Sequence, residues 1–273
     1  MHSSLPYKIV AVASTFSPRF KQVLAEAKRI RDRFDAELRA IYVGEQTEET
    51  SQTFREAFAQ LQLPIDSTIY YEGGEEPAEA ILRALAREKI GLVVAGALEK
   101  EVVLHQFLGN VARRLVREAV CSVILFTKPQ VKPKALRCIV FIADYSEHGL
   151  QALKTTLPFA EAESCERLYV IRIITAFDEA RASIGSNAAD PRDNKTNDDE
   201  EDALEKFVLS AGATEVPIET RCIRGNTGLA ASDFVRSVTA DLLVVPMRKN
   251  IRSLPSNIAW VTDVIPCNLW VIR

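Results

Sequence analysis

Two glycines and an amide side chain between residues 96 and 110 have the spacing of a phosphate-binding loop. Gly96 closes an apolar run at residues 92–95, and Gly109 with Asn110 opens a segment whose apolar residues fall on one helical face. A loop that ends at a helix N-terminus presents unpaired N–H groups and the positive end of the helix dipole, and both favour a bound phosphate. Gly96, Gly109, Asn110 and, within the same loop, His105 are therefore candidate ligand-binding residues.

Strands and helices must alternate around this loop to position it. Short apolar runs predict strands, and apolar residues at helical spacing predict the helices between them. We expect strands at residues 9–13, 38–43, 67–71, 92–95 and 121–126, and helices at residues 19–34, 48–61, 75–89 and from residue 111 onward. This alternation predicts a mostly parallel, doubly wound, five-stranded α/β sheet of Rossmann-like type.

The same plan starts again after a charged segment that contains two prolines. We expect strands at residues 138–143, 168–174, 241–245 and 265–272, with a helix at residues 150–162. Residues 241–245 match residues 91–95 at a shift of 150, and residues 265–272 match residues 119–126 at a shift of 146. We therefore predict two such α/β domains in tandem, at residues 1–128 and 136–273, joined by a linker at residues 129–135.

An acidic insertion at residues 176–202 interrupts the second copy. It holds nine acidic residues against three basic ones, together with Gly, Pro, Asn and Ser. This composition predicts a surface loop. Residues 198–202 either belong to that loop or form an acidic first turn of the helix that carries Leu204 and Phe207. A docking arm for a basic partner is the functional alternative to a plain solvated loop.

Composition and charge exclude several function classes. The net charge of −3 creates no field that would recruit nucleic acid, and no window is long and apolar enough for a transmembrane helix. The N-terminus lacks an apolar signal region, so we expect a cytoplasmic protein. The five cysteines form no C-x-x-C pair and the three histidines lack metal-ligand spacing, which predicts reduced thiols and no metal cofactor.

Together these residues resemble the universal stress protein family. The loop signature of that family is Gly, two residues, Gly, nine residues, Gly, and then Ser or Thr. Gly96 and Gly109 reproduce its spacing, whereas Glu99 replaces the middle glycine and Asn110 replaces the hydroxyl residue. The resemblance implies an adenine nucleotide, namely ATP, ADP or AMP, as the ligand.

Each copy keeps a different part of the site that the resemblance implies. The family carries Asp-x-Ser after its first strand, with the Asp facing the adenosine part of the ligand. In the first copy Thr15 and Ser17 stand at that motif without the Asp, and Val43 joins the candidate ligand-binding residues at the end of the second strand. In the second copy Asp144 and Ser146 keep the motif, but a proline replaces the first loop glycine. Asp144 and Ser146 either bind the ribose or adenine, or cap the helix that follows.

The resemblance also implies that the two closing strands, residues 122–126 and 268–272, pair within the chain and hide an apolar edge. Whether the chain also forms a homodimer stays open.

The resemblance and the partly kept site residues lead to two alternative functions. One is a stress-response sensor that binds an adenine nucleotide weakly in one copy, and the other is a non-catalytic interaction scaffold with degenerate, ligand-free sites. Slow ATP hydrolysis ranks below both, because the chain contains no catalytic motif that we recognise.

Overall fold

The protein is described here by a computed structural model covering residues 6–14, 16–64, 68–74, 76–102, 105–174, 197–225, 227–248 and 265–273. The chain divides into two compact units. Unit 1 comprises Met1–Lys134 and Thr262–Arg273, and unit 2 comprises Ala135–Val261. Thr15, most of the acidic insertion and residues 249–264 lie outside the described residues. The domain boundaries and the linker that the sequence predicts stay a prediction.

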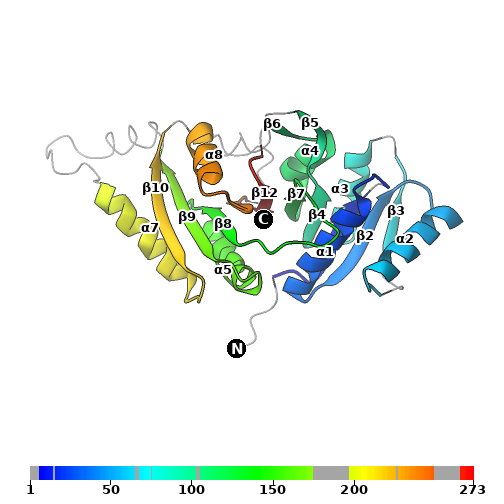
Figure 1. Ribbon diagram of the computed structural model, residues 1–273, viewed down its shortest axis with the longest axis horizontal. Coiled ribbons are helices and arrows are strands. Elements are labelled where there is room, and N and C mark those ends of the chain that lie inside the picture. The colour runs from blue at the N-terminus through cyan, green and yellow to red at the C-terminus, as the bar shows by residue number, and fades with distance from the viewer. Residues whose placement is uncertain are drawn as a thin grey trace. The chain divides into compact units, whose positions relative to one another are not determined.

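Unit 1 alternates strands and helices in the predicted order (Figure 1). Its main sheet has the strand order β12-β7-β4-β1-β2-β3, and all its pairs are parallel except β12 with β7. Because β1, β4 and β7 are almost continuously apolar and buried, they suit the centre of a sheet that is covered on both faces. The elements of unit 1 are β1 (Ile9–Ser14), α1 (Phe20–Phe34), β2 (Glu37–Val43), α2 (Glu48–Gln60), β3 (Ile69–Glu72), α3 (Pro77–Arg87), β4 (Leu92–Gly96), β5 (Leu98–Val102), β6 (His105–Leu108), α4 (Asn110–Glu118), β7 (Ser122–Phe126) and β12 (Asn268–Ile272).

Helix α1 covers the centre of this sheet. Its buried stripe includes Val23, Leu24, Ala27 and Ile30, as the periodicity predicts, and the helix contacts β1, β2 and β4. The helix ends at Asp35, which adopts the left-handed conformation with φ 47° and closes the last turn through its backbone N–H. Burial of this stripe fixes the start of α1 beside the carboxyl end of β1.

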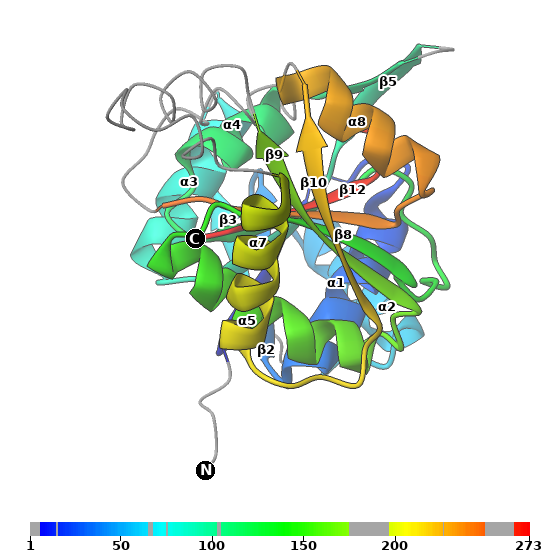
Figure 2. The ribbon, with the colours of Figure 1, turned by 90° about the vertical axis from the view of Figure 1, so that its left-hand side faces the viewer.

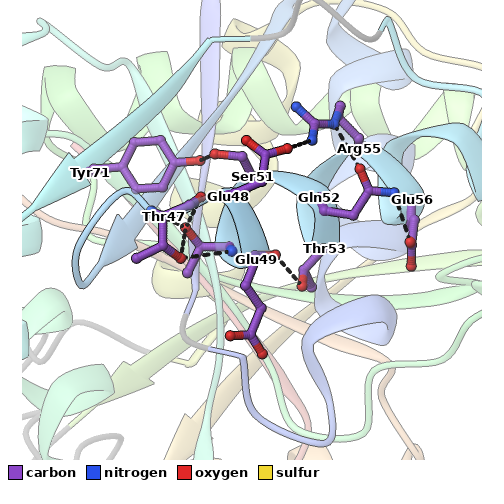
Figure 3. A network of polar contacts seen from close by, with 10 residues as sticks. Thr47, Glu48, Glu49, Ser51, Gln52, Thr53, Arg55, Glu56 and Tyr71 are labelled. Atoms are coloured by element: carbon purple, nitrogen blue, oxygen red, sulfur yellow. Dashed lines mark hydrogen bonds and ion pairs between the residues drawn. The ribbon is translucent and has the colours of Figure 1, made fainter.

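The first turn of α2 is closed by its own side chains (Figure 3). The Thr47 hydroxyl accepts a hydrogen bond from the Thr50 N–H at 3.1 Å, and the Thr47 N–H donates to the Thr50 hydroxyl at 2.8 Å. Glu48 and Glu49 add negative charge at the positive end of the helix dipole. The N-terminus of α2 is therefore satisfied without a ligand.

The segment between Gly96 and Gly109 is a hairpin, and the expectation of an irregular polar loop is wrong. Strands β5 and β6 are antiparallel, with Leu98 opposite Leu108 and Val102 opposite His105. At the base of the hairpin the Gly109 N–H donates to the Ala97 carbonyl oxygen at 2.9 Å. This bond holds the start of α4 next to the end of β4.

The two closing strands pair as predicted, and their register reflects the internal repeat. Strand β12 runs antiparallel to β7, and the pairs are Leu269 with Leu125, Trp270 with Ile124 and Val271 with Val123. The repeat shift of 146 makes Trp270 the equivalent of Ile124, so the central pair joins equivalent positions. By the same shift Leu269 is the equivalent of Val123 but pairs with Leu125, and Val271 is the equivalent of Leu125 but pairs with Val123. This reciprocal pairing is the register expected for two copies of one strand related by a local two-fold axis.

Unit 2 repeats the strand order of unit 1, and its strands β10, β9 and β8 lie side by side in Figure 2. Its strands follow the order β10-β9-β8-β11, which corresponds to β3-β2-β1-β4, and its described pairs are parallel. Helix α7 packs against β9 and β10, and it begins at residue 197, so residues 198–202 form its acidic first turn. The elements are β8 (Cys138–Ile142), α5 (Glu147–Ala162), β9 (Arg167–Ile174), α7 (Asn197–Ala211), β10 (Ile218–Arg224), α8 (Thr227–Ser237) and β11 (Leu242–Pro246).

No helix in the described part of the chain has the length and apolar character needed to cross a membrane.

Candidate functional site

A pocket of about 460 Å³ lies at the carboxyl ends of β1 and β4 in unit 1. The chain leaves β1 toward β2 on one side, and it returns through α3 to β4 on the other side. Neighbouring strands whose connections leave in opposite directions create a crevice beyond their carboxyl ends, and α/β proteins bind ligands in such crevices. The pocket is therefore where the topology predicts a ligand.

The pocket combines apolar walls with a small polar end. Ser14, the exposed Ser17 and Arg19 are the polar residues of the described lining, and no residue of that lining carries a carboxylate. The apolar side chains come from α1, α3, α4, β7 and adjoining connections, and they include Pro18, Phe20, Val23, Pro77, Ile81, Val111, Phe126 and Pro129. This composition suits a ligand that has an apolar body and carries negative charge.

Helix α4 begins at the edge of this pocket. Its N-cap, Gly109, makes no side-chain capping hydrogen bond, and its first turn holds no acidic residue. Because the Gly109 N–H donates to Ala97, the donors that face a ligand here are the first N–H groups of the helix itself, beginning at Asn110. Gly109 has φ −61° and ψ 157°, which any residue can adopt, so glycine is not required there for its backbone conformation.

The structure brings some of the predicted residues of the first copy together. Ser17, Gly96 and Gly109 all line the pocket. Val43 ends β2, and the exposed Asn110 starts α4; neither belongs to the lining. The backbone of His105 lies at the far end of the hairpin, about 13 Å along β6 from Gly109 at 3.3 Å per residue. Thr15 lies outside the described residues.

In unit 2 Asp144 and Ser146 act as a helix cap. The Ser146 hydroxyl accepts a hydrogen bond from the Gly149 N–H at 2.9 Å and donates to the Asp144 carboxylate at 2.8 Å. The Ser146 N–H also donates to Asp144, at 3.0 Å. Capping of α5 is confirmed for Ser146, and Asp144 accepts hydrogen bonds from Ser146, whereas ligand binding by either residue stays a prediction. Between them, the Tyr145 ring packs under the Arg172 guanidinium of β9 at 4.9 Å, and the Tyr145 hydroxyl donates to the Glu200 carbonyl oxygen of α7 at 3.4 Å. Burial raises the pKa of this hydroxyl.

The apolar lining of the pocket was not identified from the sequence. Val23 was placed on the buried stripe of α1, but the sequence does not show that Ile81 and Phe126 meet it, because these contacts join distant elements. The sequence did contain one signal for the position of the pocket. Both β1 and β4 were predicted, and the topological switch point lies between these two strands. Among the described residues no group of three or more His, Cys, Asp or Glu could hold a metal ion.

Comparison with known proteins finds a family match within unit 1. The Universal stress protein family matches residues 44–127, which include β4, the hairpin and α4. A protein of Thermus aquaticus described as "Universal stress protein in QAH/OAS sulfhydrylase 3'region" is 29% identical over 136 residues, covering 44% of this chain and 98% of that protein. Residues 44–127 of this chain therefore match the universal stress protein family. The matched region contains Gly96 and Gly109, the part of the site that the first copy keeps.

Solved structures extend the likeness in fold to nearly the whole chain. A putative universal stress protein from Pseudomonas aeruginosa UCBPP-PA14 has a TM-score of 0.70 and 12% identity, covering 97% of this chain and 93% of that one. A universal stress protein from Archaeoglobus fulgidus DSM 4304 has a TM-score of 0.65 and 12% identity, covering 98% of each chain. At this identity the comparison shows a shared α/β fold of universal stress protein type.

Proposed function

We propose that unit 1 binds a small phosphate-bearing ligand, with an adenine nucleotide (ATP, ADP or AMP) as the first candidate, and that the protein is a cytoplasmic stress-response sensor. The observation that carries this proposal is the position of the pocket, at the topological switch point and against the start of α4. A phosphate on the first N–H groups of α4 gains hydrogen bonds and the favourable end of the helix dipole.

The chemistry of the lining supports a ligand that is anionic at one end. Helix α2 closes its own first turn with Thr47, Thr50 and two glutamates, whereas α4 has neither a capping side chain nor an acid in its first turn. Arg19 lies at the rim of the same pocket. With no carboxylate among the described lining residues, the binding of a monophosphate is expected to be independent of Mg²⁺.

The alternative is a scaffold that binds no small ligand. The site of unit 2 supports the scaffold alternative, because Asp144 and Ser146 are hydrogen-bonded to each other and Ser146 is bonded to the start of α5. Pro246 also ends β11 at the position where β4 has Gly96. We propose that unit 2 is a second universal stress protein domain, supported by its strand order, and that its role is structural.

Calorimetric titration with ATP, ADP and AMP, each with and without Mg²⁺, tests the proposal. Gly109→Val places a branched side chain in the pocket and is expected to weaken binding by about tenfold or more. Gly73→Val is the matched control, because nothing lies within 4 Å of a Cβ at this exposed glycine outside the pocket. A ligand at 100 times its dissociation constant stabilises its binding unit by about 2.7 kcal/mol, which a thermal melt detects.

The wild-type protein and Gly73→Val are expected to bind with equal affinity. If millimolar nucleotide gives neither heat nor a thermal shift, the sensor proposal fails and the scaffold remains. If Gly109→Val keeps its affinity while folded, the ligand lies elsewhere.

A further inference from the structure

Four aromatic rings fill the space between the carboxyl ends of β1 and β2. We call these residues the aromatic cluster: Phe16, Phe20, Tyr42 and Phe54. The half-buried Phe16 is at its centre, with its ring centroid 4.5 Å from that of Tyr42, 5.0 Å from Phe54 and 5.1 Å from Phe20. These separations are those of packed aromatic pairs, so this chain fills this part of the sheet edge with its own side chains.

The aromatic cluster borders the ligand pocket. Phe20 belongs to both, because it lines the pocket and its ring also contacts Phe16 and Phe54. The described lining comes from β1, β4, β7, three helices and their connections, and it includes no residue of β2. On the side of the pocket that faces β2, Phe20 is therefore the last lining residue.

The direction in which a ligand must extend follows from the strand order β7-β4-β1-β2. A phosphate at the start of α4 lies beyond the end of β4. Phe126 and Pro129 form the wall on the β7 side. The remainder of the ligand must then run across the end of β1 toward β2. A ring at its far end meets Phe20 and, behind it, Phe16.

We propose that Phe16 is a specificity-determining residue that occupies the space a nucleotide base would need, so that a purine adds little to the affinity of the pocket for a phosphate ester. This inference rests on the proposed phosphate site and refines its ligand class. A base could enter only by displacing Phe16 from its contacts with Tyr42 and Phe54. The gain from stacking a base would be offset by the loss of those contacts.

Titrations of the full chain with ribose 5-phosphate and with AMP test this, because the two ligands differ by the adenine. Wild-type protein is expected to bind them with affinities within about threefold of each other. Phe16→Ala is expected to bind AMP about tenfold more tightly than wild type does and to leave ribose 5-phosphate unchanged. Phe16→Leu is the matched control, because it keeps an apolar side chain of similar bulk and should behave like wild type.

Thermal melts check that each variant is folded, and Phe16→Val replaces Phe16→Ala with the same expected direction if the alanine variant is not. The inference is overturned if wild type already prefers AMP by tenfold or more, or if truncation of Phe16 leaves AMP affinity unchanged. If neither ligand binds wild type but AMP binds Phe16→Ala, the proposed function fails for the natural chain and the role of Phe16 stands. Absence of binding to every folded variant overturns both.

Discussion

Replacement of Trp270 by alanine should destabilise unit 1 selectively. Trp270 is fully buried in β12, opposite Ile124 of β7, and its ring lies 5.8 Å from Phe34 and 6.4 Å from Tyr7. Truncation of a buried Trp to Ala costs about 3–5 kcal/mol, through lost burial and the cavity that remains. A loss of about 4 kcal/mol raises the unfolded fraction nearly a thousandfold, because each 1.4 kcal/mol is a factor of ten.

Hydrogen exchange measured peptide by peptide locates the effect. In Trp270→Ala the amides of β4 and β7, in the centre of the sheet of unit 1, should exchange up to about a thousand times faster if they open by global unfolding of the unit. Phe141→Ala is the matched control, because Phe141 is equally buried but lies in β8 of unit 2. It should accelerate exchange in β9 instead. Unchanged protection of β7 in Trp270→Ala would refute the assignment of β12 to unit 1.

Two further predictions concern unit 2. Ser146→Ala removes the cap of α5 and should lower the free energy of unfolding of unit 2 by about 1 kcal/mol in urea titrations, while ligand affinity in unit 1 stays the same; a loss of ligand affinity would contradict the capping role. Burial, followed by the nearby Asp241 carboxylate, raises the pKa of the Cys138 thiol from 9.0 to about 11. Because the folded state holds this proton more tightly than the unfolded chain, the contribution of Cys138 to stability is complete below pH 9 and is lost as the pH rises through 11. Alkylation of the folded protein should accelerate over the same range, and titration of this thiol near pH 9 would contradict the structure.

The sequence predicts the fold well where one residue pattern determines one element. The apolar runs of β1, β4 and β8 and the periodicity of α1 are signals of that kind, and the structure confirms them. Strand β10 and helix α8 were not predicted. In β10 the charged residues Glu219, Arg221 and Arg224 interrupt the apolar ones, as is typical of a partly exposed edge strand without a continuous apolar run.

The candidate site could be predicted only in part, because its geometry depends on contacts between distant elements. Spacing identified Gly96 and Gly109, but it could not show that the intervening residues pair as a hairpin or that the Gly109 N–H is already bonded. The role of Phe16 depends on Tyr42 and Phe54, which lie on other elements. In contrast, the capping role of Ser146 is local, and it was weighed from the sequence alone.

The most direct test of the phosphate site is ligand-dependent hydrogen exchange at the start of α4. At saturating AMP or ribose 5-phosphate, the amides of Asn110, Val111 and Ala112 should become protected, because their N–H groups would donate to the bound phosphate. The peptide that covers Asp144–Gly149 should exchange at an unchanged rate, since its cap is already complete. Protection at Asp144–Gly149 with none at residues 110–112 would contradict the proposed site.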